Sequence, residues 1–253
     1  MYRPRIIPVL LLNKDHLVKS VKFKNYNYIG DPINAVKLYN DMLADELVFL
    51  DITASKQKRL ISLDFVKEVG EEANMPFAVG GGIKTIEDIR SIISNGAEKV
   101  IIGQEAAKNP AFIKNATNVF GSSTICVCID VKKTFWGKEL VYVANGSEST
   151  TYKVEDFARL MELNGVGEII VQSIDNDGQM NGYDIELTKR VAQAVSVPVV
   201  ALGGAGSVKD MHSLYQESSV NVLAAGSLFV YQGVHKGVLI NYPSKTIKKS
   251  IYE

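Results

Sequence analysis

The chain has 253 residues, of which 46% are hydrophobic, and its 28 basic side chains balance its 28 acidic ones. A net charge of zero provides no general attraction for nucleic acid or an anionic membrane surface. No apolar run reaches the ~18 residues of a membrane-spanning helix, and the N-terminus lacks the features of a signal peptide. We therefore expect a cytoplasmic protein that binds neither nucleic acid nor membrane, with residues 1–253 forming a single domain.

Short apolar segments alternate with longer amphipathic ones along the whole chain. Strands are expected at 5–12, 46–52, 76–81, 99–103, 124–131, 168–174, 198–204 and 221–226, and helices at 32–44, 85–97, 153–165 and 184–195. Continuous apolar runs are typical of parallel strands that are buried on both faces. Strict alternation with eight strands predicts an α/β fold of the (β/α)8 TIM barrel type. A doubly wound open sheet is the alternative, but no GxGxxG motif follows the first strand.

An internal repeat supports a barrel built from two half-barrels. A shift of 122 residues (168 minus 46) superposes landmarks of the two halves: Glu46 and Glu168, Pro76 and Pro198, Gly81-Gly82 and Gly203-Gly204, and Asp88 and Asp210. These identities fall at the ends of expected elements, which favours a duplicated structural unit over chance.

Small residues at the expected strand ends suggest phosphate binding. In a (β/α)8 barrel the functional site lies at the carboxyl ends of the strands, and glycines there allow backbone N–H groups to surround a phosphate. The candidates are Gly178, Gly203, Gly204, Ala225, Gly226 and Ser227 in the second half, and Gly81, Gly82 and Gly103 in the first. Tight turns alone would also explain the glycines. The first-half site is less convincing, because Glu105 stands where the second half has Ser227 and would repel phosphate unless it points outward.

Four carboxylates lie at the ends of expected strands and are candidates for acid–base chemistry: Asp51, Asp130, Asp175 and Asp177. Helix capping, or pairing with a lysine, would account for each of them equally well. Asp130 differs from the others because it lies between apolar strand residues and precedes Lys132 and Lys133.

The opposite strand ends also carry charge. Arg5, Glu46, Lys99 and Glu168 each open a strand, and inward-facing side chains would form a ring of alternating charge across the barrel floor. The ring would be either a plug of ion pairs or a gate, and buried ion pairs rarely add much stability.

Two cysteines lie on one expected strand. Cys126 and Cys128 are two residues apart, so their side chains share a face, and we expect both to pack in the core. The three histidines lie far away in the sequence, and nothing in the chain calls for a metal or another cofactor.

With these residues in view, the chain resembles HisF, the cyclase subunit family of imidazole glycerol phosphate synthase. The matching motifs are DELVFLDITAS (45–55), VGGGI (79–83), FGS (120–122), SIDNDG (173–178) and GGAG (203–206). The resemblance implies that ammonia arrives from a HisH-like glutaminase on the N-terminal barrel face. It also implies that the four-charge ring is the ammonia gate, that Asp130 is catalytic, and that Lys19 closes over the ligand from a loop, KSVKFKNYNYIGDP.

The resemblance implies a pair of catalytic aspartates, at the ends of the first and fifth strands; the second is Asp130, whereas the first falls on Leu11. Further departures are Gly103-Gln104, in place of a polar phosphate-binding pair, and Leu202, in place of a serine. The opening RIIPVLLL and the later LINYP (239–243) resemble the divergent HisF paralogues of surface-polysaccharide sugar pathways. That resemblance implies ammonia supply to a sugar amidotransferase that forms an acetamidino group on a phosphosugar or nucleotide-sugar substrate.

Three hypotheses follow. The chain is an ammonia-dependent enzyme subunit that acts on a phosphate-bearing sugar; or it forms imidazole glycerol phosphate, with Asp130 sharing the chemistry with Asp51 or Asp177; or it is a non-catalytic ammonia conduit. Because a leucine cannot transfer a proton, the first is favoured, and losing a positioned acid–base group commonly costs about 10²–10⁴ in rate.

Overall fold

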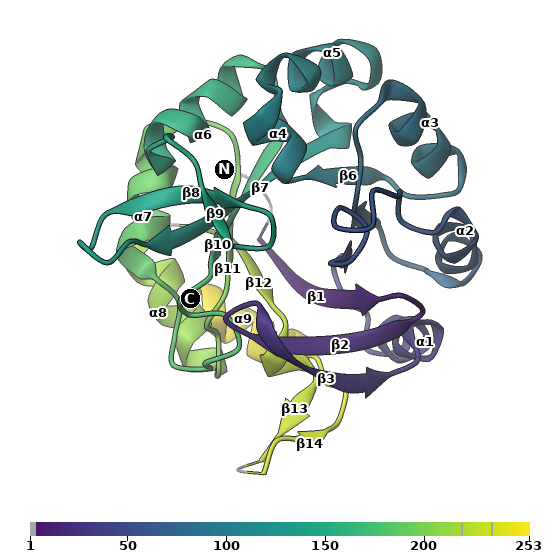
Figure 1. The fold of residues 1–253 in the computed structure, drawn as a ribbon. Helices are drawn as coiled ribbons and strands as arrows, with labels where there is room; N and C mark the ends of the chain where they lie inside the picture. Colours follow the sequence, from purple (N-terminus) through teal and green to yellow (C-terminus); the bar gives the residue numbers. More distant parts are fainter. Residues whose placement is uncertain (1–3, 219, 234) are drawn as a thin grey trace.

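The computed structural model describes residues 4–218, 220–233 and 235–253. Eight parallel strands form a closed barrel, which confirms the predicted fold (Figure 1). These barrel strands, called staves below, are β1 (Arg5–Asn13), β4 (Leu47–Asp51), β5 (Phe77–Gly80), β6 (Lys99–Ile102), β7 (Ile125–Lys133), β10 (Glu168–Ser173), β11 (Val199–Leu202) and β12 (Val222–Ala225). Pairing of β12 with β1 and of β7 with β10 leaves the barrel without an open edge.

Helices surround the barrel on the outside (Figure 1). They are α1 (Pro32–Asp41), α2 (Leu63–Glu72), α3 (Ile86–Ser94), α4 (Gln104–Lys108), α5 (Pro110–Phe120), α6 (Val154–Leu163), α7 (Ile185–Ala194), α8 (Val208–Ser218) and α9 (Lys245–Tyr252), with 3-10 turns η1 (Ser122–Thr124) and η2 (Ser227–Phe229). All four predicted helices are present, each a few residues shorter than expected. α1 begins where the Asp31 carboxylate accepts from the Asn34 amide, with Pro32 in its first turn.

Antiparallel strands extend three strand ends beyond the barrel. They are β2 (His16–Val21), β3 (Lys24–Gly30), β8 (Glu139–Val143), β9 (Glu148–Ser149), β13 (Tyr231–Gln232) and β14 (Gly237–Val238). The prediction of a loop from Lys19 to Pro32 was therefore wrong over most of its length, because the end of β2 and all of β3 lie within it and pair with each other. Pairing with Asn27 on β3 places Lys19 on a strand instead of in a loop.

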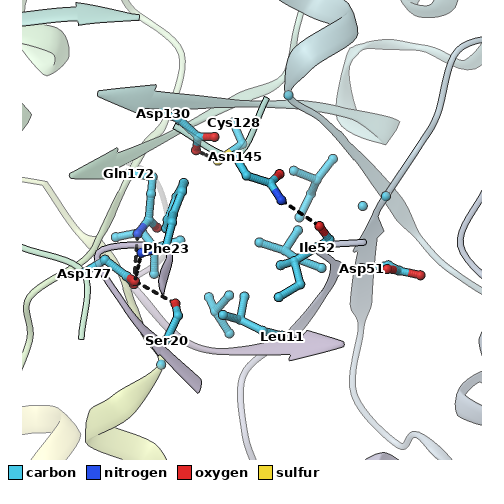
Figure 2. Close-up of a pocket in the computed structure, with 18 of the residues that line it drawn as sticks. Leu11, Ser20, Phe23, Asp51, Ile52, Cys128, Asp130, Asn145, Gln172 and Asp177 are labelled. Carbon is cyan, nitrogen blue, oxygen red and sulfur yellow. Dashed lines mark hydrogen bonds between the residues drawn. The ribbon is translucent and has the colours of Figure 1, made fainter. Parts of the chain in front are cut away.

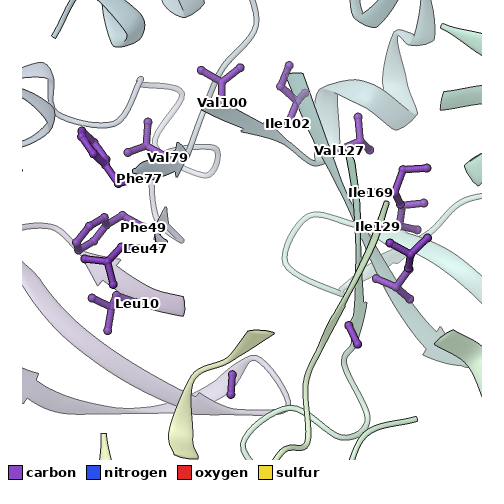
Figure 3. Close-up of a cluster of buried hydrophobic side chains, with 14 of the residues drawn as sticks. Leu10, Leu47, Phe49, Phe77, Val79, Val100, Ile102, Val127, Ile129 and Ile169 are labelled. Atoms are coloured by element: carbon purple, nitrogen blue, oxygen red, sulfur yellow. The ribbon is translucent and has the colours of Figure 1, made fainter. Parts of the chain in front are cut away.

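Side chains of the staves alternate between two apolar cores. On β1, Ile6, Leu10 and Leu12 pack outward against the helices, whereas Ile7 and Val9 join the inner core, with Leu11 packed against it. This two-residue period is the geometry of a β-strand. Figure 3 shows part of the outer core around the staves. The alternation directs position 11 into the barrel.

The two halves repeat in hydrogen bonding as well as in sequence. Before α3, Asp88 Oδ2 accepts from the amides of Lys84 and Thr85, both at 2.9 Å. Before α8, Asp210 Oδ2 accepts from the amides of Gly206 and Ser207, again both at 2.9 Å. The shift of 122 residues therefore relates equivalent helix N-termini, as the half-barrel hypothesis predicts.

Candidate functional site

A cavity of about 180 Å³ opens at the carboxyl ends of the staves (Figure 2). It is lined by all but one of the residues that the sequence suggested for catalysis or phosphate binding: Lys19, Asp51, Gly81, Gly82, Gly103, Asp130, Asp177, Gly178, Gly203, Gly204, Ala225, Gly226 and Ser227. Asp175 is not among the lining residues; its carboxylate accepts from the Lys133 amide at 2.9 Å instead. The fold thus gathers residues from both halves around one cavity.

Asp130 faces the cavity from β7. The thiol of Cys128, two residues earlier on the same strand, donates to Asp130 Oδ1 over 3.7 Å. Burial raises the pKa of Asp130 to about 7; the Cys128 hydrogen bond opposes the rise, and the Asp177 charge adds to it. A carboxyl group with this pKa can accept or release a proton near neutrality.

Asp177 faces the same cavity from the segment after β10. Its Oδ2 accepts from the Ser20 hydroxyl at 2.9 Å, and its Oδ1 accepts from the Gln172 amide at 3.3 Å (Figure 2). Burial raises the pKa of Asp177, although these donors, the Phe23 amide and the Lys19 charge oppose the rise. Asp177 is therefore the second acid that shares the cavity with Asp130.

Asp51 is held by the loop that follows its strand. Oδ1 accepts from the backbone and hydroxyl of Thr53 at 2.9 and 2.8 Å and from the Ala54 amide at 3.0 Å. Oδ2 pairs with Arg59 at 2.6 Å. Figure 2 shows this carboxylate directed away from the cavity centre. The arrangement supports loop stabilisation, and a catalytic role for Asp51 stays a prediction.

The cavity floor is largely apolar. Leu11, Leu50 and Cys128 pack against the inner core below the cavity, and Leu202 belongs to that core. The prediction that both cysteines are core residues was half wrong: Cys126 is buried, whereas Cys128 is partly exposed in the cavity. The two-residue period of β7 places Cys128 on the face of Asp130. That spacing was the signal that could have identified this thiol as a site residue.

Lys19 lies beside the second-half glycines. Its ammonium group donates to the Val9 carbonyl, and a Cβ at Gly226 would lie only 2.5 Å from its Nζ. Burial lowers the pKa of Lys19 to about 8, opposed by the Asp177 charge. Gly204 also meets a backbone constraint, because a Cβ there would lie 2.1 Å from the Gly182 carbonyl oxygen. Close packing therefore explains some of these glycines, and phosphate binding stays a prediction.

The first-half site differs from the second. Glu105 is half-buried and lines the cavity, which disfavours the alternative that it points outward. Gln104 is already engaged, because its Oε1 accepts from the Ala144 amide at 3.2 Å. An acid at this position disfavours a second phosphate on this side.

The four predicted ring residues meet at the barrel floor. Arg5 pairs with Glu46 and Glu168, and Lys99 pairs with the same two carboxylates at 2.9 and 3.2 Å. Burial lowers the pKa of Lys99, but Glu168 and Glu46 outweigh it and raise the value above the ordinary one. Lys99 therefore stays protonated near neutrality, and each cation of the ring bridges both acids.

A small cavity lies directly above this ring. Glu46, Lys99 and Glu168 line its base, and Val9 and Ile101 line both this cavity and the upper one. Apolar inner-core side chains thus separate the charged floor from the carboxylates above. A small neutral molecule such as ammonia suits that environment better than an ion.

Metal-binding clusters and membrane-spanning helices were the two remaining features of interest in the described residues. Within it, no three His, Cys, Asp or Glu side chains converge closely enough to hold a metal ion. Of the helices in the same residues, none has both the length and the apolar composition to cross a bilayer.

Some residues of the site were missed by sequence reasoning. Gln172 faces the cavity next to Asp177, and Ser20 contacts the same acid from β2. Asn145 follows β8 and donates to the Ile52 carbonyl at 2.9 Å, which connects two cavity walls (Figure 2). No local pattern marks these residues, because their partners are distant in sequence.

Together, the closed parallel barrel, the cavity at its carboxyl ends and the charged floor define a TIM-barrel protein with its ligand site at the C-terminal face. Residues 5–236 match the model of a family described as histidine biosynthesis protein. The chain belongs to this family and is HisF-like.

Curated relatives cover nearly the whole chain. The imidazole glycerol phosphate synthase subunit HisF of Alkaliphilus metalliredigens is 47% identical over 92% of this chain and 93% of its own. A putative imidazole glycerol phosphate synthase subunit HisF of Leptospira interrogans is 43% identical over the full length of both. A putative subunit hisF2 of Pseudomonas aeruginosa is 44% identical over 96% of this chain and 97% of its own. Similarity therefore extends to proteins named as additional HisF copies.

Proposed function

We propose that this chain is a HisF-type synthase subunit that takes ammonia from a HisH-like glutaminase and directs it to amidation of a phosphate-bearing sugar. The observation that carries the proposal is a complete ring of Arg5, Glu46, Lys99 and Glu168 below a cavity that has leucine at position 11. The entry route resembles that of an ammonia-using synthase, whereas half of the family's acid pair is absent. Acetamidino-sugar formation for a surface polysaccharide is the product class that fits the resemblance.

Each part of the cavity has a role in this proposal. Ammonia enters between the ring side chains and crosses the apolar layer at Val9 and Ile101. Asp130, with its pKa near neutrality, accepts a proton from ammonia as nitrogen attacks and returns it to a leaving oxygen. Lys19 and the second-half glycines bind the phosphate group of the substrate. A cytoplasmic location stays a prediction.

Imidazole glycerol phosphate formation is the second candidate, because Asp177 supplies a second acid within the cavity. Its charge raises the pKa of Asp130, so the two carboxyl groups are electrostatically coupled. The relative from Alkaliphilus metalliredigens carries the name of that synthase. A non-catalytic conduit is the third candidate, favoured by the apolar floor around Leu11.

Turnover of the histidine-pathway ribulosyl substrate with an ammonium salt separates these candidates. We expect no activity from the unmodified protein, because Leu11 cannot transfer a proton. Activity in the unmodified protein would overturn the sugar proposal in favour of the synthase reaction. Activity gained only on Leu11→Asp would show that the site was altered mainly at this residue. Asp130→Asn in the Leu11→Asp background is the matched control and should lose any gained rate.

The conduit candidate needs a different readout. In the complex with its glutaminase and the sugar-modifying enzyme, Asp130→Asn should lower amidated product if the barrel performs chemistry. If the barrel only conducts ammonia, Asp130→Asn should leave product formation unchanged. Glutamine hydrolysis measured in parallel confirms that the ammonia supply is intact.

A further inference from the structure

The strand β7 continues past Asp130 into a hairpin that projects from the C-terminal face. The turn between β7 and β8 carries Phe135 and Trp136, whose side chains are 95% and 88% exposed. Among the described residues these are the two most exposed large apolar side chains. Tryptophan is enriched among the residues that contribute most to protein–protein binding. Two adjacent, almost fully exposed aromatic side chains form an apolar patch, and such patches often mark a protein interaction site.

The turn is structurally defined. The Thr134 amide donates to the Lys138 carbonyl at 2.8 Å, and the Gly137 amide donates to the Thr134 carbonyl at 2.9 Å. Gly137 has a φ of +76°, a conformation that favours glycine. The two aromatic rings pack edge to face with centroids 5.5 Å apart. A preformed aromatic pair loses little conformational entropy on binding.

Ion pairs fix the base of the hairpin to the barrel. Glu139 pairs with Arg190 on α7 and with Lys133 at 3.6 Å, and Arg190 also pairs with Glu155 on α6 at 2.8 Å. The negative charge of Glu139, at the base of the hairpin, is therefore balanced by Arg190 and Lys133. The charged side chains of the segment 132–138 are all basic, Lys132, Lys133 and Lys138, and of these Lys133 is already paired with Glu139 and Asp184. The exposed end is therefore apolar and positively charged in a chain whose net charge is zero.

The hairpin is also connected to the cavity. β8 runs from the turn back to the cavity wall, where Val143, Ala144 and Asn145 are lining residues. The charged ring lies at the opposite end of the barrel, since Glu168 pairs in register with Cys126 near the start of β7. A protein bound at the hairpin would therefore leave the floor accessible to a glutaminase.

We propose that the turn Thr134–Lys138 docks into an apolar cleft with an acidic rim on a protein partner that consumes what the cavity delivers. Phe135 and Trp136 fill the cleft, and the lysines pair with the rim carboxylates. Complementary charge speeds association and fixes orientation, and the aromatic anchors supply most of the affinity. That the partner consumes ammonia or amidated product rests on the proposed function; the docking itself does not.

The test places a photo-crosslinking amino acid at position 136 in the full chain within its native cell. Position 38 is the control, because Leu38 is 42% exposed on α1 at the outer side of the barrel. We expect a protein adduct at 136 that is absent at 38, joined through a peptide next to aspartates and glutamates. Adducts at 136 with anionic lipid, with a second copy of this chain, or with nothing would overturn the proposal.

The purified adduct partner then provides a binding measurement. Phe135→Ser/Trp136→Ser should weaken binding at least tenfold, whereas Leu38→Ser should not. Lys132→Glu/Lys138→Glu should weaken binding more at low salt than at high salt, with Lys114→Glu on α5 as the matched control. Unchanged binding by the hairpin variants would refute the proposal. Vesicles containing phosphatidylglycerol test the lipid alternative directly, and hairpin-dependent sedimentation with them would also refute it.

The two proposals fail differently. If the function proposed above is wrong, amidated product does not depend on the ring, yet adduct formation and binding at the hairpin are unaffected. If the docking proposal is wrong, the hairpin variants bind the purified adduct partner like the unmodified chain, whatever the outcome for amidated product. Glutaminase binding to the hairpin variants provides the control for their correct folding.

Discussion

The thiol of Cys128 donates to the carboxylate of Asp130 over 3.7 Å, and both side chains face the cavity from β7. Burial also raises the pKa of the Cys128 thiol well above its ordinary value, and the neighbouring Asp130 charge adds to the rise. The thiol therefore stays protonated near neutrality and acts as a donor. Its hydrogen bond favours the charged form of Asp130 against the desolvation that opposes it.

Removing this donor should change the titration of Asp130. Cys128→Ala is expected to raise the pKa of Asp130 above about 7, because the hydrogen bond that lowers it is lost. Cys128→Ser, which keeps a donor, should largely restore the original value. Carbon-13 NMR of the labelled carboxyl group measures both. An unchanged pKa in the alanine variant would show that the thiol contributes nothing.

The raised pKa of Asp130 also has a consequence for stability. Between pH 3.8 and about 7 the folded protein retains a proton that the unfolded chain releases. Stability contributed by this group is therefore lost as pH rises through that window. Asp130→Asn should flatten the pH dependence of the unfolding free energy there, measured by urea denaturation. A parallel curve for the variant and the unmodified protein would contradict the assignment.

The floor ring should be sensitive to loss of one acid. Glu46→Gln leaves Arg5 and Lys99 sharing Glu168 alone, and the Glu46 side chain is only 4% exposed. We expect a loss of roughly 3–5 kcal/mol in unfolding free energy, typical of breaking a buried ion pair. Glu71→Gln, which removes an exposed pair with Lys67, should change it by less than about 1 kcal/mol.

The same variant tests the gate. Product formed from glutamine in the assembled complex should fall with Glu46→Gln, whereas product formed from added ammonium salt should not. Equal losses with both nitrogen sources would indicate a purely structural ring.

Asp51 should behave as a structural residue. Asp51→Asn weakens the pair with Arg59 and is expected to cost roughly 2–4 kcal/mol of unfolding free energy. Arg59→Gln should have an effect of the same sign, and the double variant should show less than the sum, because both act on one contact. Denaturant titration gives all three values. Lost turnover with unchanged stability in Asp51→Asn would instead assign it to catalysis.

Two glycines of the first half should differ in tolerance. A Cβ at Gly82 would lie 1.8 Å from the Arg59 carbonyl oxygen, and the residue has a φ of +73°. Gly82→Ala should therefore cost about 3 kcal/mol or more. At Gly103 the nearest atom to a Cβ is the Cys128 carbonyl oxygen at 3.7 Å, so Gly103→Ala should remain within about 1 kcal/mol. Thermal unfolding compares them, and similar losses would contradict this distinction.

The barrel architecture and the floor ring could both be predicted from local sequence patterns. Eight apolar segments with intervening helices specify the barrel because strand and helix periodicities are local, and the shift of 122 residues exposed the duplication. Strand starts share one end of a parallel barrel, so Arg5, Glu46, Lys99 and Glu168 had to meet. The same logic placed Leu11 and Asp130 at one cavity.

Tertiary structure alone decided how each acid is used. Asp51 ends β4 and Asp177 lies in the turn after β10, yet one is engaged by Arg59 and the other by Ser20, which lies 157 residues away in the chain. The pairing of β2 with β3 likewise formed strands where a loop was expected, and Lys19 is buried on β2. Such contacts form only on folding, because desolvation and hydrogen bonding depend on neighbours that no local pattern specifies.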